Sequence, residues 1–133
     1  MKCIFCRIAS GDIPALKIYE DEKIISFLDI NPVVRGHLLV IPKKHSRWLW
    51  DMDGEDYLYL KNKTKYLANA LRKAFRTEWV EEAVAGMGVE HTHIHLLPRH
   101  FDDGLPEIPT AMLNPKPSEE EMKEIQERIK ENL

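Results

Sequence analysis

Hydrophobic and polar residues follow one another along the chain in short blocks of different period. Blocks rich in β-forming residues predict strands at residues 17–20, 24–28, 37–41, 78–85 and 91–97. Three charged residues separate the first two blocks, which is the spacing of a hairpin. The third block is an apolar run that ends at Pro42, as expected of a strand buried on both faces. Pro98 is expected to stop the last strand.

Three further segments predict helices. Apolar residues recur every three or four positions between residues 54 and 76, which predicts a long amphipathic helix covering one face of the sheet. A short helix is expected over residues 3–9, and a last helix begins where Ser118 and Glu121 can form a capping box. Its narrow apolar stripe should rest on the body of the protein or on a partner subunit, through Met122, Ile125 and Ile129. The fold class predicted by these elements is α+β.

A proline-rich segment precedes the last helix. It follows Asp102 and runs to Pro117, and its composition predicts an extended arm with little structure of its own. We therefore divide the chain into a domain of residues 1–101 and a C-terminal part, residues 102–133, made of this arm and the last helix.

Composition limits the kind of protein. A chain of 133 residues with 44% hydrophobic residues, 31% charged residues and a net charge of -3 is typical of one soluble globular domain. The acidic balance argues against long nucleic acids but leaves short phosphorylated ligands open. No apolar run approaches the ~20 residues that cross a bilayer, and the first residues lack the pattern of a secretory signal. We expect no membrane partner and a cytoplasmic location.

Two clusters of residues carry candidate chemistry. Side chains alternate between the faces of a strand, so His91, His93 and His95 should share one face. Three histidines at this period are hard to explain by packing, and they suit either phosphate chemistry or a catalytic zinc ion. Cys3 and Cys6 form a C-x-x-C pair, which in a reducing compartment indicates a metal site or redox chemistry more than a structural disulfide.

The segment His-Thr-His-Ile-His-Leu-Leu resembles the signature of the histidine triad (HIT) family, in which histidines alternate with hydrophobic residues. Thr92 is its one departure from that pattern. Other segments resemble the bacterial, zinc-containing branch of the family, at residues 3–8, 27–32, 36–45 and 97–99. The resemblance implies a HIT-like fold: a five-stranded antiparallel sheet with one long helix packed on it, a short N-terminal helix and a C-terminal helix. It also implies a homodimer.

The resemblance further implies a nucleotide hydrolase. His93 would attack the α-phosphorus of a nucleotide and form a transient nucleotidyl-histidine, from which water releases the monophosphate. His95 would stabilise charge on the phosphoryl oxygens, and His37 would assist phosphate binding or proton movement. The leaving group is an amine in a phosphoramidate or a nucleotide in a dinucleoside polyphosphate, and the sequence does not choose between them.

The same resemblance implies a purine nucleotide pocket. Asp29 would accept hydrogen bonds from the ribose hydroxyls. Apolar side chains would form the slot for the base, namely Ile4, Phe5, Ile8, Phe27 and Ile30. Backbone amides of the bend before the triad, at Gly88 and Val89, would hold phosphate oxygens. Many relatives have glutamine and serine where this chain has Met87 and Gly88, so a nucleotide-binding or adaptor module without turnover is the alternative function.

The resemblance also implies a structural zinc ion. Zinc-bearing members use the first triad histidine and the histidine that ends the Pro-Lys-Lys-His segment, which gives the set Cys3, Cys6, His45 and His91. That set would leave His93 and His95 free for phosphate. A catalytic zinc ion held by all three triad histidines is the competing hypothesis.

Overall fold

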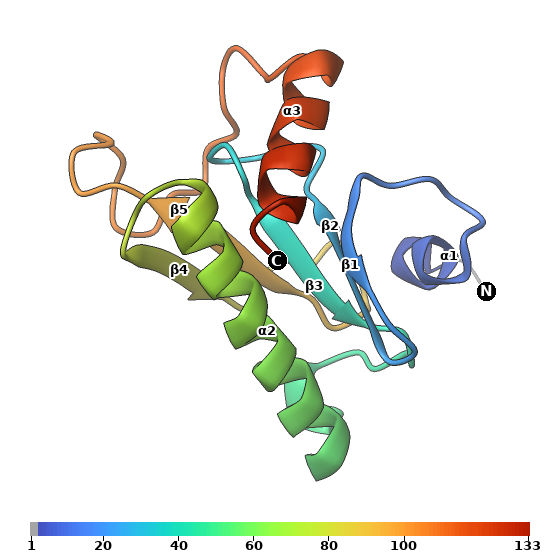
Figure 1. Ribbon diagram of the computed structural model, residues 1–133. Helices are drawn as coiled ribbons and strands as arrows, with labels where there is room; N and C mark the ends of the chain where they lie inside the picture. The colour runs from blue at the N-terminus through green and yellow to red at the C-terminus, as the bar shows by residue number, and fades with distance from the viewer. Residues whose placement is uncertain (1–2) are drawn as a thin grey trace.

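A five-stranded antiparallel sheet with helices on both faces organises the protein, as a computed structural model of residues 3–133 shows (Figure 1). The strand order is β1-β2-β3-β5-β4, with the strands at Lys17–Glu20, Ile24–Leu28, Leu38–Pro42, Trp79–Ala83 and Ile94–Arg99. This confirms the α+β class and the five-stranded antiparallel sheet. Residues 1 and 2, which belong to the proposed domain of residues 1–101, lie outside the described residues.

The helices begin where the sequence supplies capping side chains. Helix α1 spans Ile4–Ser10 and ends at Gly11, whose φ of +88° places it in the left-handed region. Helix α2 spans Gly54–Ala74. Helix α3 spans Glu119–Lys130 and begins with the predicted capping box, since the Ser118 and Glu121 side chains each bind the other residue's backbone N–H. A short 3-10 helix, η1, covers Leu49–Asp51. None of the helices among the described residues is long and apolar enough to span a membrane.

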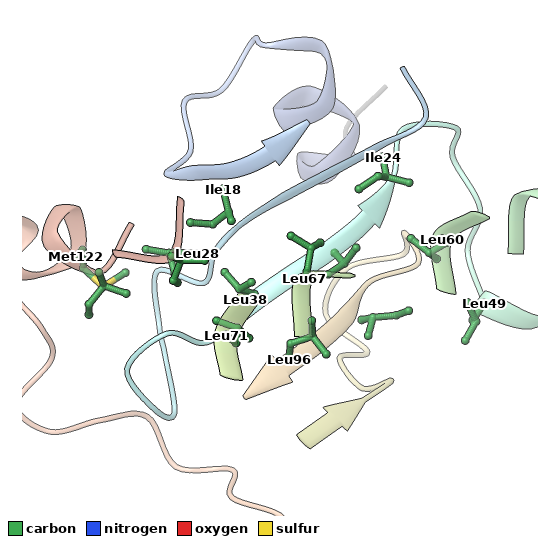
Figure 2. Close-up of a cluster of buried hydrophobic side chains, with 14 residues drawn as sticks. Ile18, Ile24, Leu28, Leu38, Leu49, Leu60, Leu67, Leu71, Leu96 and Met122 are labelled. Atoms are coloured by element: carbon green, nitrogen blue, oxygen red, sulfur yellow. The ribbon is translucent and has the colours of Figure 1, made fainter. Parts of the chain in front are cut away.

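Alternation along β2 and β3 sends side chains into two separate cores. Ile24 and Leu28 pack beneath α2 and α3 in the larger cluster, whose side chains Figure 2 draws. Ile25 and Phe27 face the opposite side, where Phe5 of α1 covers them. Every residue of β3 is buried, which confirms a strand enclosed on both faces.

The last strand differs from its predicted limits. It begins at Ile94 and runs through Pro98 to Arg99, so residues 91–93 precede the strand. The N–H and hydroxyl of Thr92 donate to the carbonyl of Ser46 at 2.6 and 3.0 Å, so this segment binds the loop after β3 and not β3 itself. Pro98 does not end the strand. Strand β5 pairs with β3 only as far as Leu96, so Pro98 has β4 as its one neighbouring strand, and a proline without an N–H is tolerated there.

Two other limits shift by a few residues. Strand β4 is shorter than the predicted residues 78–85, since the chain leaves the sheet after Ala83. Strand β3 starts one residue after His37 and includes Pro42, which pairs with Ile24 of β2. His37 therefore lies in the turn that enters β3, where its N–H donates to the carbonyl of Val34 at 3.3 Å.

Helix α3 packs against its own chain. Its three apolar side chains are buried in the larger core with α2, and the Gln126 amide donates to the carbonyl of Lys17 in β1 at 2.8 Å. The body of the protein, and not a partner subunit, therefore covers the stripe predicted from the sequence. The arm, residues 103–117, is described throughout and contains neither helix nor strand.

A buried arginine attaches the start of the arm to the sheet. The Arg99 side chain is 1% exposed, and its guanidinium donates to two carboxylates and two carbonyls, those of Asp103, Glu81, Pro106 and Glu107. It also lies 4.4 Å from the centre of the Trp79 ring. The hydrogen bonds from Arg99 hold the pKa of Asp103 well below its usual value. The Arg99 side chain thus binds carboxylates and carbonyls of β4 and of the arm at the same time.

Substitution of Arg99 by methionine should destabilise the fold strongly. Without the guanidinium, Glu81 and Asp103 lose their cation and two carbonyls lose a donor, and breaking a buried ion pair costs about 3 kcal/mol or more. The free energy of unfolding measured by urea titration should fall by that amount. Arg72→Met, on the exposed face of α2, is the matched control and should change it by less than about 0.5 kcal/mol. Equal effects of the two substitutions would show that the Arg99 network adds no stability.

Candidate active site

Four histidines and Asp29 meet on the α1 face of the sheet. His95 lies on β5 opposite Leu39, and its ring centre is 5.1 Å from the rings of both His93 and His37. His91 lies farther along and approaches the cysteines of α1. The predicted convergence of the triad on one surface is therefore present, although its first two members precede the strand.

His93 is held in one orientation with one nitrogen free. Its Nδ1 lies 2.7 Å from the carbonyl oxygen of His91, which can only accept, so Nδ1 carries the proton and Nε2 keeps its lone pair. The side chain is 7% exposed, and burial lowers its pKa below the usual 6.5. The Phe5 ring and the imidazole form a T-shaped pair with ring centres 5.1 Å apart. A neutral, oriented imidazole with a free Nε2 is a competent nucleophile at neutral pH.

Gly86 lies against this free nitrogen. Its φ is +115°, and a Cβ added there would collide with Nε2 of His93. Both the conformation and the space therefore require glycine at this position. The sequence pattern did not identify Gly86 or its contact with His93. No local pattern reveals this contact, because it depends on how the bend folds back onto the triad.

His37 and His95 form a chain of hydrogen bonds with fixed direction. The backbone N–H of Val33 donates to Nδ1 of His37 at 3.2 Å, so Nε2 of His37 carries the proton. That Nε2 lies 2.8 Å from Nδ1 of His95, and Nε2 of His95 lies 2.9 Å from the carbonyl of Ala85. Burial lowers the pKa of His37 to about 4. Two backbone groups, invisible to sequence analysis, thus set the tautomers of both histidines.

Asp29 stands at the end of this row. Its Oδ1 accepts the N–H of Asn31 at 2.8 Å, and its Oδ2 lies 3.5 Å from Nε2 of His37. The side chain is 20% exposed. A partly exposed carboxylate in this position can accept hydrogen bonds from a diol.

The side chains expected around the base separate into two groups. Phe5 and Phe27 are buried in the smaller core, and Ile8 and Val89 pack against it. Ile4 and Ile30 are exposed, Ile30 by 66%, and so are available to a ligand. Met87 is 90% exposed, and Gly88 is exposed as well.

The predicted metal ligands come together in a second cluster. Sγ of Cys3 lies 3.3 Å from Nδ1 of His91, Sγ of Cys6 lies 3.2 Å from Nδ1 of His45, and the two Nδ1 atoms are 3.2 Å apart. All four ligand atoms lie within 4.8 Å of one another. In a tetrahedral zinc site with bonds of about 2.0–2.3 Å, ligand atoms are about 3.3–3.8 Å apart.

The surroundings of this cluster suit a closed metal site. Nε2 of His91 lies 2.8 Å from the carbonyl of Pro42, so Nε2 donates and Nδ1 offers its lone pair to the cluster. The Thr92 hydroxyl donates to the carbonyl of Ser46 and so holds the triad segment beside His45. This contact explains why a polar residue replaces a hydrophobic one at position 92. Burial raises the pKa of the Cys6 thiol to about 11, so binding of a cation must displace thiol protons.

The ligand geometry does not favour a catalytic metal ion held by the three triad histidines. Among the described residues, His91 groups with the cysteines, whereas His95 groups with Asp29 and His37. In the second group, Nε2 of His37 carries a proton because the Val33 N–H occupies Nδ1. A cation bound at Nε2 would move that proton to Nδ1. Two N–H donors, those of Nδ1 and Val33, would then face each other. The histidines of the row are thus arranged for hydrogen bonding.

Comparison of the sequence with protein families and with known proteins points to one family, the HIT domain family. Residues 10–102 match the sequence model of the HIT domain. The chain is 40% identical over 109 residues to an uncharacterized HIT-like protein of Borreliella burgdorferi, covering 77% of this chain and 78% of that protein. It is 31% identical over 139 residues to the adenosine 5'-monophosphoramidase hnt1 of Schizosaccharomyces pombe, covering 100% and 99% of the two chains.

A solved structure shares the fold over nearly the whole chain. The zinc-bound histidine triad family protein of Mycobacterium smegmatis superposes with a TM-score of 0.83 at 33% identity, covering 99% of this chain and 93% of that one. The crystal structure of that relative contains zinc. The similarity extends beyond the HIT domain into the arm and α3.

Proposed function

Because the chain belongs to the HIT domain family, we propose that it is a hydrolase that cleaves the bond between a nucleoside 5′-phosphate, with AMP as the expected nucleotide, and its leaving group. The observation that carries this proposal is His93, whose Nδ1 is bound to the His91 carbonyl and whose Nε2 is free. His95 lies beside it with fixed hydrogen bonds, and Asp29 lies at the ribose end of the row.

The reaction would proceed in two displacements at phosphorus. In the first, the lone pair on Nε2 of His93 forms a bond to the α-phosphorus, while the bond to the leaving group breaks and that group departs with the electron pair and takes up a proton. In the second, a water oxygen attacks phosphorus, the phosphorus–nitrogen bond breaks, and Nε2 regains its lone pair while the water loses a proton. His95 and the amides of Gly88 and Val89 would bind the phosphoryl oxygens in both steps.

The charge of the site favours one class of leaving group. Burial lowers the pKa of His37, His91 and His93, so these imidazoles bring no positive charge near pH 7. Asp29 adds a negative charge. A phosphoramidate carries a single negative charge at its phosphate, whereas a dinucleoside tetraphosphate carries several that would go unpaired here. We therefore propose phosphoramidates of AMP as the preferred substrates, the class named for the fission yeast relative.

A hydrolysis assay tests the activity and the preference together. The protein should release AMP from adenosine 5′-phosphoramidate with a kcat/KM at least about ten-fold above that for diadenosine tetraphosphate. Measured AMP release across both substrates gives the ratio, and a variant lacking His93 is the blank. If stoichiometric phosphoramidate stays intact in a single-turnover experiment while AMP binds normally, the chain is a nucleotide-binding module. The absence of a polar side chain at Met87 and Gly88 is the feature that favours this second candidate.

The proposal includes a structural zinc ion, a location and an oligomeric state. Cys3, Cys6, His45 and His91 would hold Zn²⁺, which would fix α1 to the loop after β3.

We place the protein in the cytoplasm, where the two thiols stay reduced. We further propose a homodimer, and the edge strand β4 is one surface at which two sheets could join.

A further inference from the structure

The end of the arm lies against the turn that follows Asp29. The backbone N–H of Leu113 donates to the carbonyl of Pro32 at 2.9 Å, and Nζ of Lys116 donates to the side-chain oxygen of Asn31 at 3.4 Å. The matched HIT domain ends at residue 102, so these contacts come from outside it. They bring a C-terminal segment to the turn that carries the exposed Ile30.

Helix α3 continues this attachment. Its Glu121 forms an ion pair with Arg35 at 3.0 Å, and Pro117, the last residue of the arm, is buried. Glu121 also belongs to the capping box, so the ion pair joins the first turn of α3 to the loop between β2 and β3. Three separate contacts therefore hold residues 31–35 from the C-terminal side.

Asn31 connects the contact with Lys116 to Asp29. The backbone N–H of Asn31 donates to Oδ1 of Asp29, and this bond leaves Oδ2 directed toward the histidine row. Because the aspartate side chain is short, its hydrogen bond to the backbone two residues later fixes the orientation of the carboxylate. Any movement of Asn31 would therefore change the direction in which Asp29 presents its free oxygen.

We propose that Lys116, near the end of the arm, is a positioning residue of the nucleoside subsite that acts through Asn31 to hold Asp29 toward the ribose. The inference rests on the proposed function, in which Asp29 accepts hydrogen bonds from the ribose hydroxyls. Lys116 itself does not touch the nucleotide. Its contribution to affinity consequently depends on the presence of the diol in the ligand.

Calorimetric titrations with AMP and with 2′,3′-dideoxy-AMP test this dependence. Lys116→Met should weaken AMP binding about three-fold, as expected for the loss of one exposed hydrogen bond, and leave dideoxy-AMP binding unchanged. Lys116→Arg should restore most of the AMP affinity. Lys123→Met, which removes the same charge from the exposed face of α3, is the matched control and should alter neither affinity.

A double-mutant cycle examines the route through Asn31. If Lys116 acts by that route, Asn31→Ala should weaken AMP binding, and adding Lys116→Met to it should weaken binding no further. Equal weakening of both ligands by Lys116→Met would reveal a general electrostatic effect and overturn the proposal, as would unchanged AMP binding. A wild-type protein that binds both ligands equally would overturn the ribose role of Asp29 itself, and that outcome is distinct from a failure at Lys116.

Discussion

Replacement of His93 by alanine is expected to abolish formation of the nucleotidyl-enzyme and to lower kcat by at least about 10⁴-fold, since removal of a covalent nucleophile typically costs this much or more. In the proposed mechanism, the Nε2 of His93 forms the bond to phosphorus, because Nδ1 is bound to the His91 carbonyl. The substitution removes a side chain that is 7% exposed and leaves the hydrogen bond between His37 and His95 in place. AMP should therefore still bind with roughly unchanged affinity.

Denaturing mass spectrometry after mixing with adenosine 5′-phosphoramidate measures the covalent step directly. His100→Ala is the matched control because it removes an exposed imidazole from the residue that follows β5. The control should label and turn over normally. Labelling of the His93→Ala protein, or turnover near that of the control, would refute the assignment of the nucleophile. Because burial keeps the pKa of His93 below 6.5, labelling of the unaltered protein should persist in mildly acidic buffer.

Local signals in the sequence suffice for much of the sheet. Strands β1 and β2 have the limits predicted, because their pattern and their turn agree. In that turn, Asp21 accepts the N–H groups of Lys23 and Ile24, a role typical of aspartate in hairpins. Helix α3 likewise begins at its capping box. Where side-chain chemistry and period point to the same element, the prediction from one sequence holds.

Long-range contacts account for the differences. The alternation of His91, Thr92 and His93 is that of a strand, but the hydrogen bonds of Thr92 go to Ser46, more than 40 residues earlier. No local pattern reveals that partner. The tautomers of the histidine row depend in the same way on backbone groups of Val33 and Ala85, whose side chains carry no chemical signal. Tertiary structure thus supplies the orientation of residues whose types the sequence already indicates.

Removal of zinc is expected to lower the melting temperature by about 15 °C. A metal at about 1,000 times its dissociation constant adds about 4 kcal/mol to the free energy of unfolding, and each kcal/mol corresponds to about 4 °C for a domain of this size. The four proposed ligands come from α1 and its N-cap residue, from the loop after β3 and from the segment before β5. Loss of the ion would remove the link between α1 and these segments and weaken the packing of Phe5 in the smaller core.

Differential scanning calorimetry with and without a chelator measures this change, and metal analysis should find about one zinc ion per chain. The double variant Cys3→Ser with Cys6→Ser is the control, because its melting temperature should be low and should not respond to the chelator. A structural ion predicts that chelated protein kept well below its melting temperature still labels His93. Loss of labelling without loss of stability would instead indicate a catalytic metal ion. An unchanged melting temperature in protein that contains no metal would remove zinc from the proposal, because the fold around these four residues would then be stable without the ion.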